Sequence, residues 1–488
     1  MQEPFLNSSP RMANELRGGH EHYSERYGLI LKLGSGFFAD AYDLFIIDLV
    51  LAILDQFPES AGLGLTDSTR GLVASATSFG AIAGMLFFGV IGDRVGRRAA
   101  ILCTGSLVFI GSVASSLVVR WDTFPLAYQL CVARSVLGFG IGGEYPLSAA
   151  MAAEKAHPEV RGRVVAGVFS MQGVGMIAAA LIPMALLSFG LPLELTWRLL
   201  MAFAVIPSGA SLYWRFGLEE SAAFNEVDMN RAVDIWTNLT STVVELKSPL
   251  LGAALAWLLM DITFYGTGEF KHVIASKLLE EQQGFAQVRR DAVFALIVSL
   301  IALPGYLCSC FFIDKIGRCQ LQALGFSMMA LFYSISALCI GLGAATWVNL
   351  FVFSGTFFWT NFGPNVTTYI IPSETFPVQI RTTCHGICAA SGKVGAVVGA
   401  YFFPVVQSSL GVPSVLVICS VIAVLGLVCT LKLVTDTPIR LDTSTSTLST
   451  IEMGNFQGLR ERPGGKYVRL SSLSVGVPSN VDMYTACE

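Results

Sequence analysis

The stretch GFGIGGEYPLSAA, residues 138–150, places Glu144 and Tyr145 inside an apolar segment that runs from about residue 124 to residue 153. A carboxylate at the centre of a bilayer costs about 2.5 to 3.5 kcal/mol, so Glu144 must face protein or a water-filled cavity. The glycines before it let another helix approach closely, and Pro146 frees a backbone carbonyl for a polar interior. The segment predicts a membrane helix with one polar face. The alternative is a buried acid that is only hydrogen-bonded.

The composition indicates a polytopic, all-α membrane protein. Of 488 residues, 53% are hydrophobic and 14% are charged, far from the average of soluble domains. Apolar windows of about 20 residues, the length that crosses a bilayer, predict twelve helices in two sets of six. They lie near residues 29–54, 70–92, 98–119, 123–153, 164–189, 195–215, 249–270, 290–313, 319–342, 345–372, 382–409 and 412–435.

Basic residues set the predicted orientation, because loops rich in Lys and Arg stay in the cytoplasm. Such clusters follow the second, fourth and eighth spans, whereas the loop 271–290 mixes bases with acids. We therefore expect a multi-pass protein of the plasma membrane with both termini in the cytoplasm. The predicted parts are a cytoplasmic N-terminal segment (1–28), a six-helix bundle (29–215), a cytoplasmic linker (216–248), a second six-helix bundle (249–435) and a disordered, Ser- and Thr-rich cytoplasmic tail (436–488).

The two sets of helices repeat one another. GDRVGRR (92–98) recurs as IDKIGRC (313–319), and 314 − 93, 317 − 96 and 318 − 97 all equal 221. Parallel halves of this kind are typical of the major facilitator fold, whose substrate site lies near the midplane between the halves. Further pairs at an offset of 220 or 221 are Glu154 with Glu374, Arg161 with Arg381, Asp40 with Asp261, and Glu144 with Asn365.

Several longer motifs carry a family resemblance that spans residues 28 to 435. The chain resembles the phosphate:proton symporters of plants and fungi, which belong to the major facilitator superfamily. The resemblance implies inward transport of inorganic phosphate coupled to protons. The motifs are GFFADAYDLF (36–45), GIGGEYPLSAA (140–150), FSMQG (169–173), WLLMDITFY (257–265), NFGPNVTTYIIPSETFP (361–377) and CHGICAASGKVGA (384–396).

The first span contains acids that cannot face lipid. Asp40 and Asp43 lie about 60° apart on one helical face, while Asp48 lies nearer the outer end and fits a solvated rim better than a functional site. Arg134, in the fourth span, falls at roughly the depth of Asp43. We expect Arg134 to pair with Asp43 or Asp40 and to gate the release of a proton. A static ion pair that joins two helices is an equally good explanation.

The seventh span places Trp257, Asp261 and Tyr265 four residues apart, on an arc of about 80°. An aromatic stripe is usually core packing, but a central acid at mid-span favours a site. The resemblance implies that six residues line the phosphate site. Their hydroxyl, indole and amide groups donate hydrogen bonds to an oxyanion. The six are Tyr145, Gln172, Trp257, Asp261, Tyr265 and Asn365.

A doubly charged phosphate among several carboxylates would be repelled by several kcal/mol. Binding then requires protonated acids, the monovalent anion, or both, and proton and anion each favour the other's binding. The predicted coupling residues are Asp40, Asp43, Glu144 and Arg134. Lys393, within SGKVGA, is expected to attract the anion or neutralise a carboxylate after release. Its alternative is a side chain that snorkels toward the cytoplasm.

The repeated basic turns are predicted to close the cytoplasmic side. Their carboxylates can cap or pair with neighbouring helices, although an orientation signal alone would explain the same residues. The predicted gate comprises Asp93, Arg97, Glu154, Arg161, Asp314, Arg318, Glu374 and Arg381.

Two positions depart from the family pattern. Position 144 is usually Asp in the family, and the extra methylene of Glu144 leaves its contact and the substrate's size open. After Tyr265 the family has an amide-rich segment, whereas this chain reads GTGEFKHV (266–273), so the outer vestibule is expected to differ.

Three functions remain open from the sequence. The first is proton-coupled import of phosphate, the second a carrier of an organic phosphate such as a glycerophosphodiester or of a sugar, and the third a nutrient receptor that signals without transport. No nucleophile-base pair, metal spacing or disulfide framework emerges, so we expect neither an enzyme nor a cofactor. Inorganic phosphate, protons and the bilayer are the expected partners, with no nucleic acid. The oligomeric state stays open.

Overall fold

The computed structural model describes residues 10–57, 65–121, 123–226, 239–269, 285–435 and 438. The chain divides into two compact units, residues 1–441 and 442–488, and the second lies outside the described residues. So do most of the predicted tail, part of the predicted linker and much of the loop 271–290.

The first six predicted spans each correspond to helical segments, and the sixth is broken at Ala204. Their bounds are α1 Pro10–Leu54, α2 Asp67–Val95, α3 Arg97–Ser116, α4 Leu126–Lys155, α5 Arg161–Ser188, α6 Leu193–Phe203 and α7 Val205–Phe216. The single turns η2 Pro158–Val160 and α8 Ala222–Asn225 lie outside these spans. The first helix begins well before the predicted residue 29, because apolar windows detect only the part of a helix that meets lipid.

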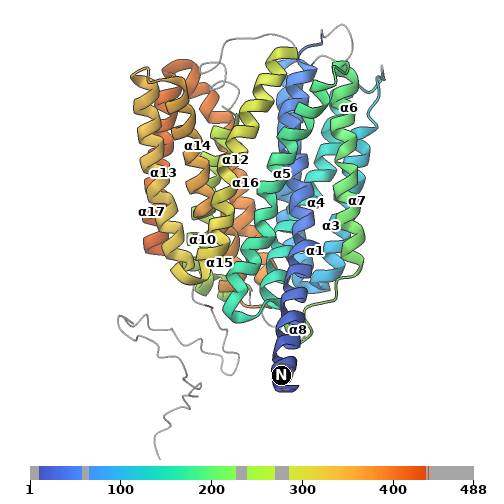
Figure 1. The fold of residues 1–488 in the computed structure, drawn as a ribbon, viewed down its shortest axis with the longest axis vertical. Coiled ribbons are helices and arrows are strands. Elements are labelled where there is room, and N and C mark those ends of the chain that lie inside the picture. The colour runs from blue at the N-terminus through green and yellow to red at the C-terminus, as the bar shows by residue number, and fades with distance from the viewer. Residues whose placement is uncertain are drawn as a thin grey trace, which may run out of the picture. The chain divides into compact units, whose positions relative to one another are not determined.

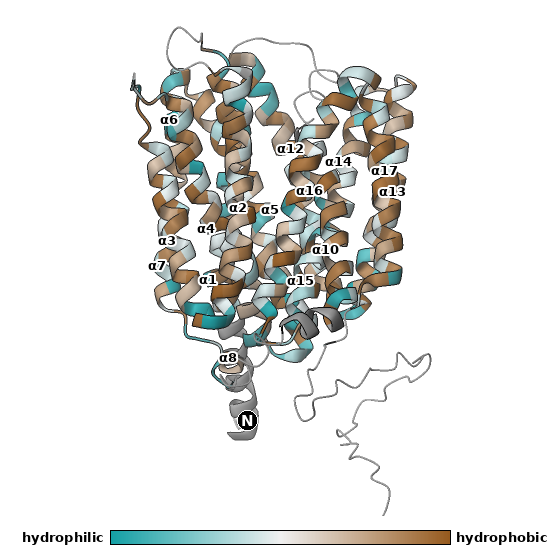
Figure 2. Ribbon diagram, turned by 180° about the vertical axis from the view of Figure 1, so that it is seen from behind, coloured by the Kyte–Doolittle hydropathy of each residue, from teal (hydrophilic) through white to brown (hydrophobic). Residues whose placement is uncertain are grey.

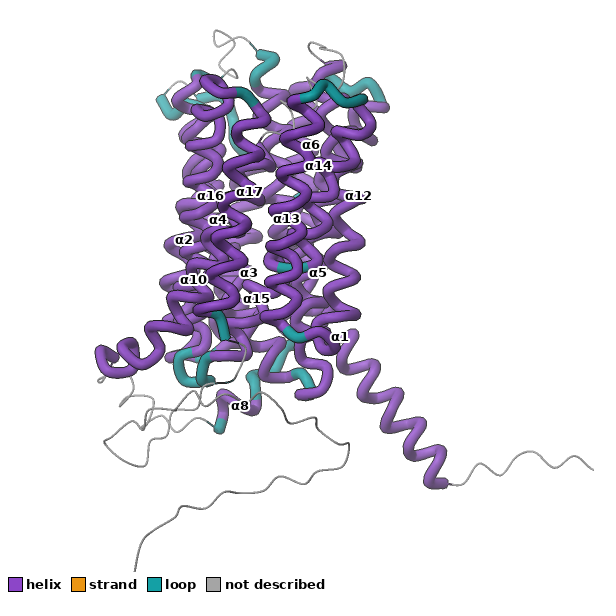
Figure 3. The backbone as a smooth tube through the Cα atoms, turned by 90° about the vertical axis from the view of Figure 1, so that its left-hand side faces the viewer, coloured by secondary structure: helices purple, strands orange, loops and turns teal. Residues whose placement is uncertain are grey.

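The second six spans also correspond to helices, and here the tenth is broken. Their bounds are α10 Leu239–Glu269, α12 Phe285–Ile316, α13 Arg318–Gly341, α14 Thr346–Phe362, α15 Pro364–Thr375, α16 Arg381–Leu410 and α17 Val412–Leu433. The break falls at Gly363, whose φ of −134° and ψ of −107° interrupt the helix before Pro364. Every regular element in the described residues is helical (Figure 3).

Nine segments of the described chain are long and apolar enough to cross a membrane. The other predicted spans are α1, α4 and the interrupted α14–α15 pair. Apolar residues cover most of each outer helix, and hydrophilic residues gather toward the two ends (Figure 2). A multi-pass membrane protein follows from these spans.

The repeat seen in the sequence recurs in the backbone. Gly96 and Gly317 adopt φ values of 113° and 98°, in the left-handed region that glycine favours, and each separates two consecutive helices. The N-terminal helices α1–α7 and the C-terminal helices α10–α17 lie on opposite sides in Figure 1. They meet along α2 with α16 and along α5 with α12, which are equivalent pairs in the repeat.

Glycines bring α2 and α4 close together, as the opening motif predicts. A Cβ added at Gly138 would overlap the carbonyl oxygen of Thr77, and one at Gly142 would overlap that of Ala81. The close packing fixes α4, and with it Glu144 and Tyr145, inside the bundle.

Candidate functional site

The six predicted substrate residues come from α4, α5, α10 and α15, so both sets of helices contribute. The rings of Tyr145 and Trp257 lie 6.3 Å apart across the two sets. Apart from the half-buried Tyr265, each of the six is at most 4% exposed. The carboxylate oxygen Oδ2 of Asp261 and the amide oxygen of Gln172 are buried without a hydrogen-bond partner in the described structure.

Lys393 on α16 lies within this group. Its ammonium Nζ is 2.5 Å from the hydroxyl of Tyr265 and 3.9 Å from Asp261 Oδ2, and the side chain is 3% exposed. The ammonium also lies 3.9 Å from the ring centre of Tyr265 and 5.5 Å from that of Tyr145. Lys393 therefore does not snorkel to a surface. It places a positive charge beside two tyrosine rings and an acid.

Asn365 lies just after the helix break at Gly363. Its amide Nδ2 donates to the hydroxyl of Tyr306 at 2.9 Å and to the side-chain oxygen of Asn361 at 2.7 Å. Sequence reasoning did not select Tyr306, because an isolated Tyr in an apolar span carries no signal of its own. The break ends α14 and starts α15, whose second residue is Asn365. Irregular backbone of this kind is tolerated at membrane depth where it is buried in protein or lines a cavity.

Aromatic rings close the site toward the end of the helices where the basic turns lie. Phe37, Phe169 and Tyr369 pack together, with ring centres 4.6 Å to 5.5 Å apart. Phe37 also packs edge-on against Tyr145 at 5.1 Å. Because Tyr369 comes from α15, this aromatic layer joins both sets of helices below the site.

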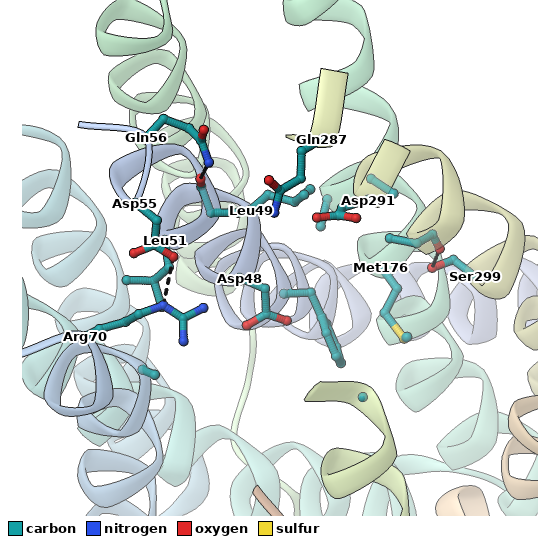
Figure 4. Close-up of a pocket in the computed structure, with 17 residues that line it drawn as sticks. Asp48, Leu49, Leu51, Asp55, Gln56, Arg70, Met176, Gln287, Asp291 and Ser299 are labelled. Carbon is teal, nitrogen blue, oxygen red and sulfur yellow. Dashed lines mark hydrogen bonds and ion pairs between the residues drawn. The ribbon is translucent and has the colours of Figure 1, made fainter. Parts of the chain in front are cut away.

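On the other side, the rings of Phe45 and Tyr265 stack at 6.4 Å, and Phe45 also lines a cavity of about 440 Å³. We call this cavity the vestibule. Its lining includes Asp48 on α1, Asp55 just after the end of α1, and Gln287 and Asp291 on α12 (Figure 4). Arg70 donates to Asp55 at 2.9 Å. Within the described residues, no three His, Cys, Asp or Glu side chains are arranged to hold a metal ion.

Arg134 pairs with Asp43 and not with Asp40. Arg134 Nη1 lies 3.3 Å from Asp43 Oδ1, and Nη2 donates to the Asp43 carbonyl at 2.5 Å. Thr77 accepts from Arg134 Nε, and Ser112 donates to the second carboxylate oxygen of Asp43. Both carboxylate oxygens of Asp40 are buried and lack a hydrogen-bond partner in the described chain.

Glu144 bonds through both carboxylate oxygens to Arg215, near the end of α7. Both side chains are at most 1% exposed. The sequence did not single out Arg215, because a basic residue near the end of a predicted span is usually interpreted as a solvated flanking residue. The pair directs the carboxylate of Glu144 toward α7. Arg215 is therefore the contact of Glu144 that the sequence left undetermined.

The predicted gate residues form two ion-pair clusters at the end of the helices opposite the vestibule. In the first, Arg97 contacts Asp93 at 3.3 Å and Glu154 at 3.1 Å, and Arg381 from the second set contacts Glu154 at 3.0 Å. Asp93 also accepts the backbone N–H groups of Thr382 and Thr383.

In the second cluster, Arg318 contacts Asp314 at 2.9 Å and Glu374 at 2.7 Å, while Asp314 accepts the N–H of Arg163 from the first set. Arg161 is a charged neighbour of Arg381, and among the described ion pairs it has none with Glu374. The equivalent positions in the two halves are therefore used differently.

Comparisons with known proteins place the chain in a family. The model of the family "Sugar (and other) transporter" matches residues 29–441. The chain is 35% identical to inorganic phosphate transporter 1-1 of Arabidopsis thaliana, with 77% of this chain and 83% of that protein covered. It is 33% identical to the low affinity inorganic phosphate transporter 1 of Petunia hybrida, with 77% and 81% covered.

Solved structures support the fold. A proton:xylose symporter of the major facilitator superfamily matches with a TM-score of 0.68 at 19% identity, covering 85% of this chain and 97% of that one. The inward-open xylose transporter of E. coli matches with a TM-score of 0.60 at 20% identity, covering 84% and 97%. The chain thus belongs to the sugar and other transporter family of the major facilitator superfamily, in the group that contains the plant inorganic phosphate transporters.

Proposed function

We propose that the protein imports inorganic phosphate together with protons by alternating access. The observation that carries this proposal is the position of Lys393, a buried cation that contacts Tyr265 and Asp261 on α10 and lies 5.5 Å from the ring of Tyr145 on α4. An apolar or neutral substrate has no need of that charge, whereas an oxyanion gains a charge-assisted hydrogen bond from it. The names of the relatives point to the same substrate.

The charge of the substrate affects how tightly it would bind, because the carboxylate of Asp261 lies close to Lys393. An anion that bonds to Lys393 would lie within several ångströms of this carboxylate, where two like charges repel by about 4 kcal/mol at an effective dielectric of 20. A proton on Asp261 removes that repulsion and supplies one more donor. The monovalent anion and a proton on Asp261 therefore bind together, and each raises the affinity for the other.

Alternating access follows from the two ends of the bundle. The ion-pair clusters at Asp93 and Asp314 hold one end together, and the vestibule lies at the other. We propose that the six-helix halves, residues 29–215 and 249–435, rock about the central site. Release of both clusters would open the passage beneath the aromatic layer of Phe37, Phe169 and Tyr369.

We assign the clustered end to the cytoplasm, since the basic residues concentrate there. With this orientation both termini are cytoplasmic, and uptake from outside implies the plasma membrane. The matched relatives and solved structures are transporters, and we propose that this chain likewise moves its substrate without converting it.

Purified protein in liposomes tests the proposal. Labelled phosphate should accumulate when the external solution is acidic and should only equilibrate when the pH is equal on both sides. Lys393→Met and Lys432→Met are reconstituted in the same way. Lys432 lies exposed in the last turn of α17, so its variant is the matched control for Lys393→Met. Absence of accumulation by the wild type in a correctly inserted preparation would contradict the transport function.

Competition separates the substrates that the sequence left open. Unlabelled phosphate should abolish uptake of the label, while a glycerophosphodiester or a sugar at the same concentration should not. Strong inhibition by the glycerophosphodiester, together with its own accumulation, would assign the site to an organic phosphate.

A further inference from the structure

The Glu144–Arg215 pair lies directly against α1. A Cβ added at Gly36 would overlap Arg215 Nη2 and would lie 2.5 Å from Glu144 Oε2. Arg215 also borders Gly105 on α3, where an added Cβ would lie 3.0 Å from Nη1. Glycine on both neighbouring helices therefore makes the space that this arginine occupies.

Asp40 lies one helical turn from Gly36 on the same face of α1, because residues four apart are neighbours. Its carboxylate oxygens are buried and lack hydrogen-bond partners in the described structure. An unpaired, ionised carboxylate there would cost several kcal/mol, so this arrangement suits an Asp40 that carries a proton. The titratable groups around Asp40 are Asp43 on α1, Glu144 and Tyr145 on α4, Arg215 on α7 and Tyr369 on α15.

Among these neighbours, Arg215 is the cation available to Asp40. Arg134 is held by the carboxylate and the carbonyl of Asp43, and Lys393 lies against Tyr265 and Asp261. An Asp40 that loses its proton therefore needs Arg215 as its counter-ion, although Arg215 is bound to Glu144 in this conformation.

We propose that Arg215 is a positioning residue for proton coupling that exchanges one carboxylate partner for another. It pairs with Glu144 while Asp40 holds a proton. The proton then leaves the carboxyl of Asp40 for the carboxylate of Glu144, and the guanidinium moves to the new carboxylate at Asp40. Before and after the step the three groups comprise one cation, one carboxylate and one neutral acid, so no unpaired charge is left in the bundle.

The exchange also gives the proton a direction. The carboxylate of Glu144 lies beside Gly36, one helical turn closer than Asp40 to the N-terminal end of α1, so the step moves the proton toward the clustered end of the bundle. This inference rests on the proposed function, since it names how the N-terminal helices would handle the coupled proton. The longer side chain of Glu144 fits the role, because it reaches from α4 to Arg215 of α7 beside Gly36 of α1.

The double variant Glu144→Gln, Arg215→Gln tests the exchange, since it removes both charges and leaves two amides that can bond to each other. In liposomes it should still exchange labelled phosphate at equal pH, and it should fail to accumulate phosphate under a pH gradient. Accumulation equal to that of the wild type would mean that the pair is a static brace and would overturn the proposal.

Glu144→Asp provides a second test that does not depend on the double variant folding. The shorter carboxylate loosens its hold on Arg215, which then favours the ionised form of Asp40. The external pH of half-maximal uptake should fall by about half a unit, a differential interaction of about 0.7 kcal/mol. An unchanged pH profile would overturn the proposal. A wild type that takes up no phosphate would instead overturn the transport function.

Discussion

The ammonium of Lys393 lies 2.5 Å from the hydroxyl of Tyr265 and 3.9 Å from the centre of its ring. The lysine comes from α16 and the tyrosine from α10, and the same ring stacks with Phe45 at the floor of the vestibule. We expect a substrate that enters from the vestibule to displace Tyr265 before it reaches the cation. On the proposed function, the contact would therefore link anion binding to closure of the vestibule.

Lys393→Met should weaken phosphate binding by a factor of about one hundred, because loss of a buried, hydrogen-bonded charge costs about 2 to 5 kcal/mol. The dissociation constant can be measured from the stabilisation of the purified protein by added phosphate. Lys432→Met changes the same residue type at an exposed position and should leave the constant unaltered. Equal affinities for phosphate in the two variants would show that Lys393 does not contribute to phosphate binding.

Asp261→Asn should make phosphate binding nearly independent of pH. The amide resembles the protonated acid, so it can donate a hydrogen bond but cannot repel the anion. In the wild type, rising pH removes the proton from Asp261 and weakens binding, whereas the variant should hold its affinity up to the pH where phosphate itself becomes a dianion. The affinity at several pH values checks this. A variant with the full pH dependence of the wild type would place the coupled proton elsewhere.

The sequence predicted the membrane spans and singled out candidate site residues because each left a local signal. Apolar windows mark the helices, and acids such as Asp40 and Asp261 stand out within them. The sequence could not predict which partner each charge takes. Asp43 takes Arg134 and Glu144 takes Arg215, and these choices depend on the packing of α1, α4 and α7 in three dimensions.

The same limit applies to the central aromatic residues. Phe37 and Tyr369 lie within motifs that were singled out, yet their positions facing each other follow only from the contact between α1 and α15. Equivalent positions also diverge, since Glu154 reaches Arg381 across the two halves, while Glu374 contacts Arg318 within its own. A sequence repeat predicts similar backbone structures in the two halves, but it does not determine which partner each side chain takes.

Gly36→Ala should destabilise the protein by about 1 to 3 kcal/mol, the usual cost of overpacking a tight interior. The new methyl group has no room beside Arg215 and Glu144. Gly28→Ala adds the same methyl to the same helix with no atom within 4 Å and should change the melting temperature little. Thermal unfolding in detergent compares the two. Equal melting temperatures would mean that the arginine does not occupy this space.

Arg134→Ala should destabilise the protein by about 3 to 5 kcal/mol, because it leaves Asp43 buried without its cation. The double variant Asp43→Asn, Arg134→Gln removes both charges and should recover most of that loss. If the pair gates proton release, the recovered protein should still transport with an altered pH dependence. Normal accumulation and a normal pH profile would make the pair a structural brace.

Asp93→Asn should open the clustered end more often. The carboxylate of Asp93 accepts the N–H groups of Thr382 at 3.1 Å and Thr383 at 2.8 Å, at the start of α16, where a negative charge is favourable. Loss of this charge should cost the closed state about 1.5 to 3 kcal/mol, a change of roughly tenfold or more in the open fraction.

The rate at which Cys384 is alkylated, measured by mass spectrometry, reports this opening. Cys384 follows Thr383 on α16 and is only 5% exposed in the closed state. Asp55→Asn, at the vestibule, is the matched control and should leave that rate unchanged, because its ion pair with Arg70 lies at the other end of the bundle. Equal alkylation in both variants would show that Asp93 does not hold the gate.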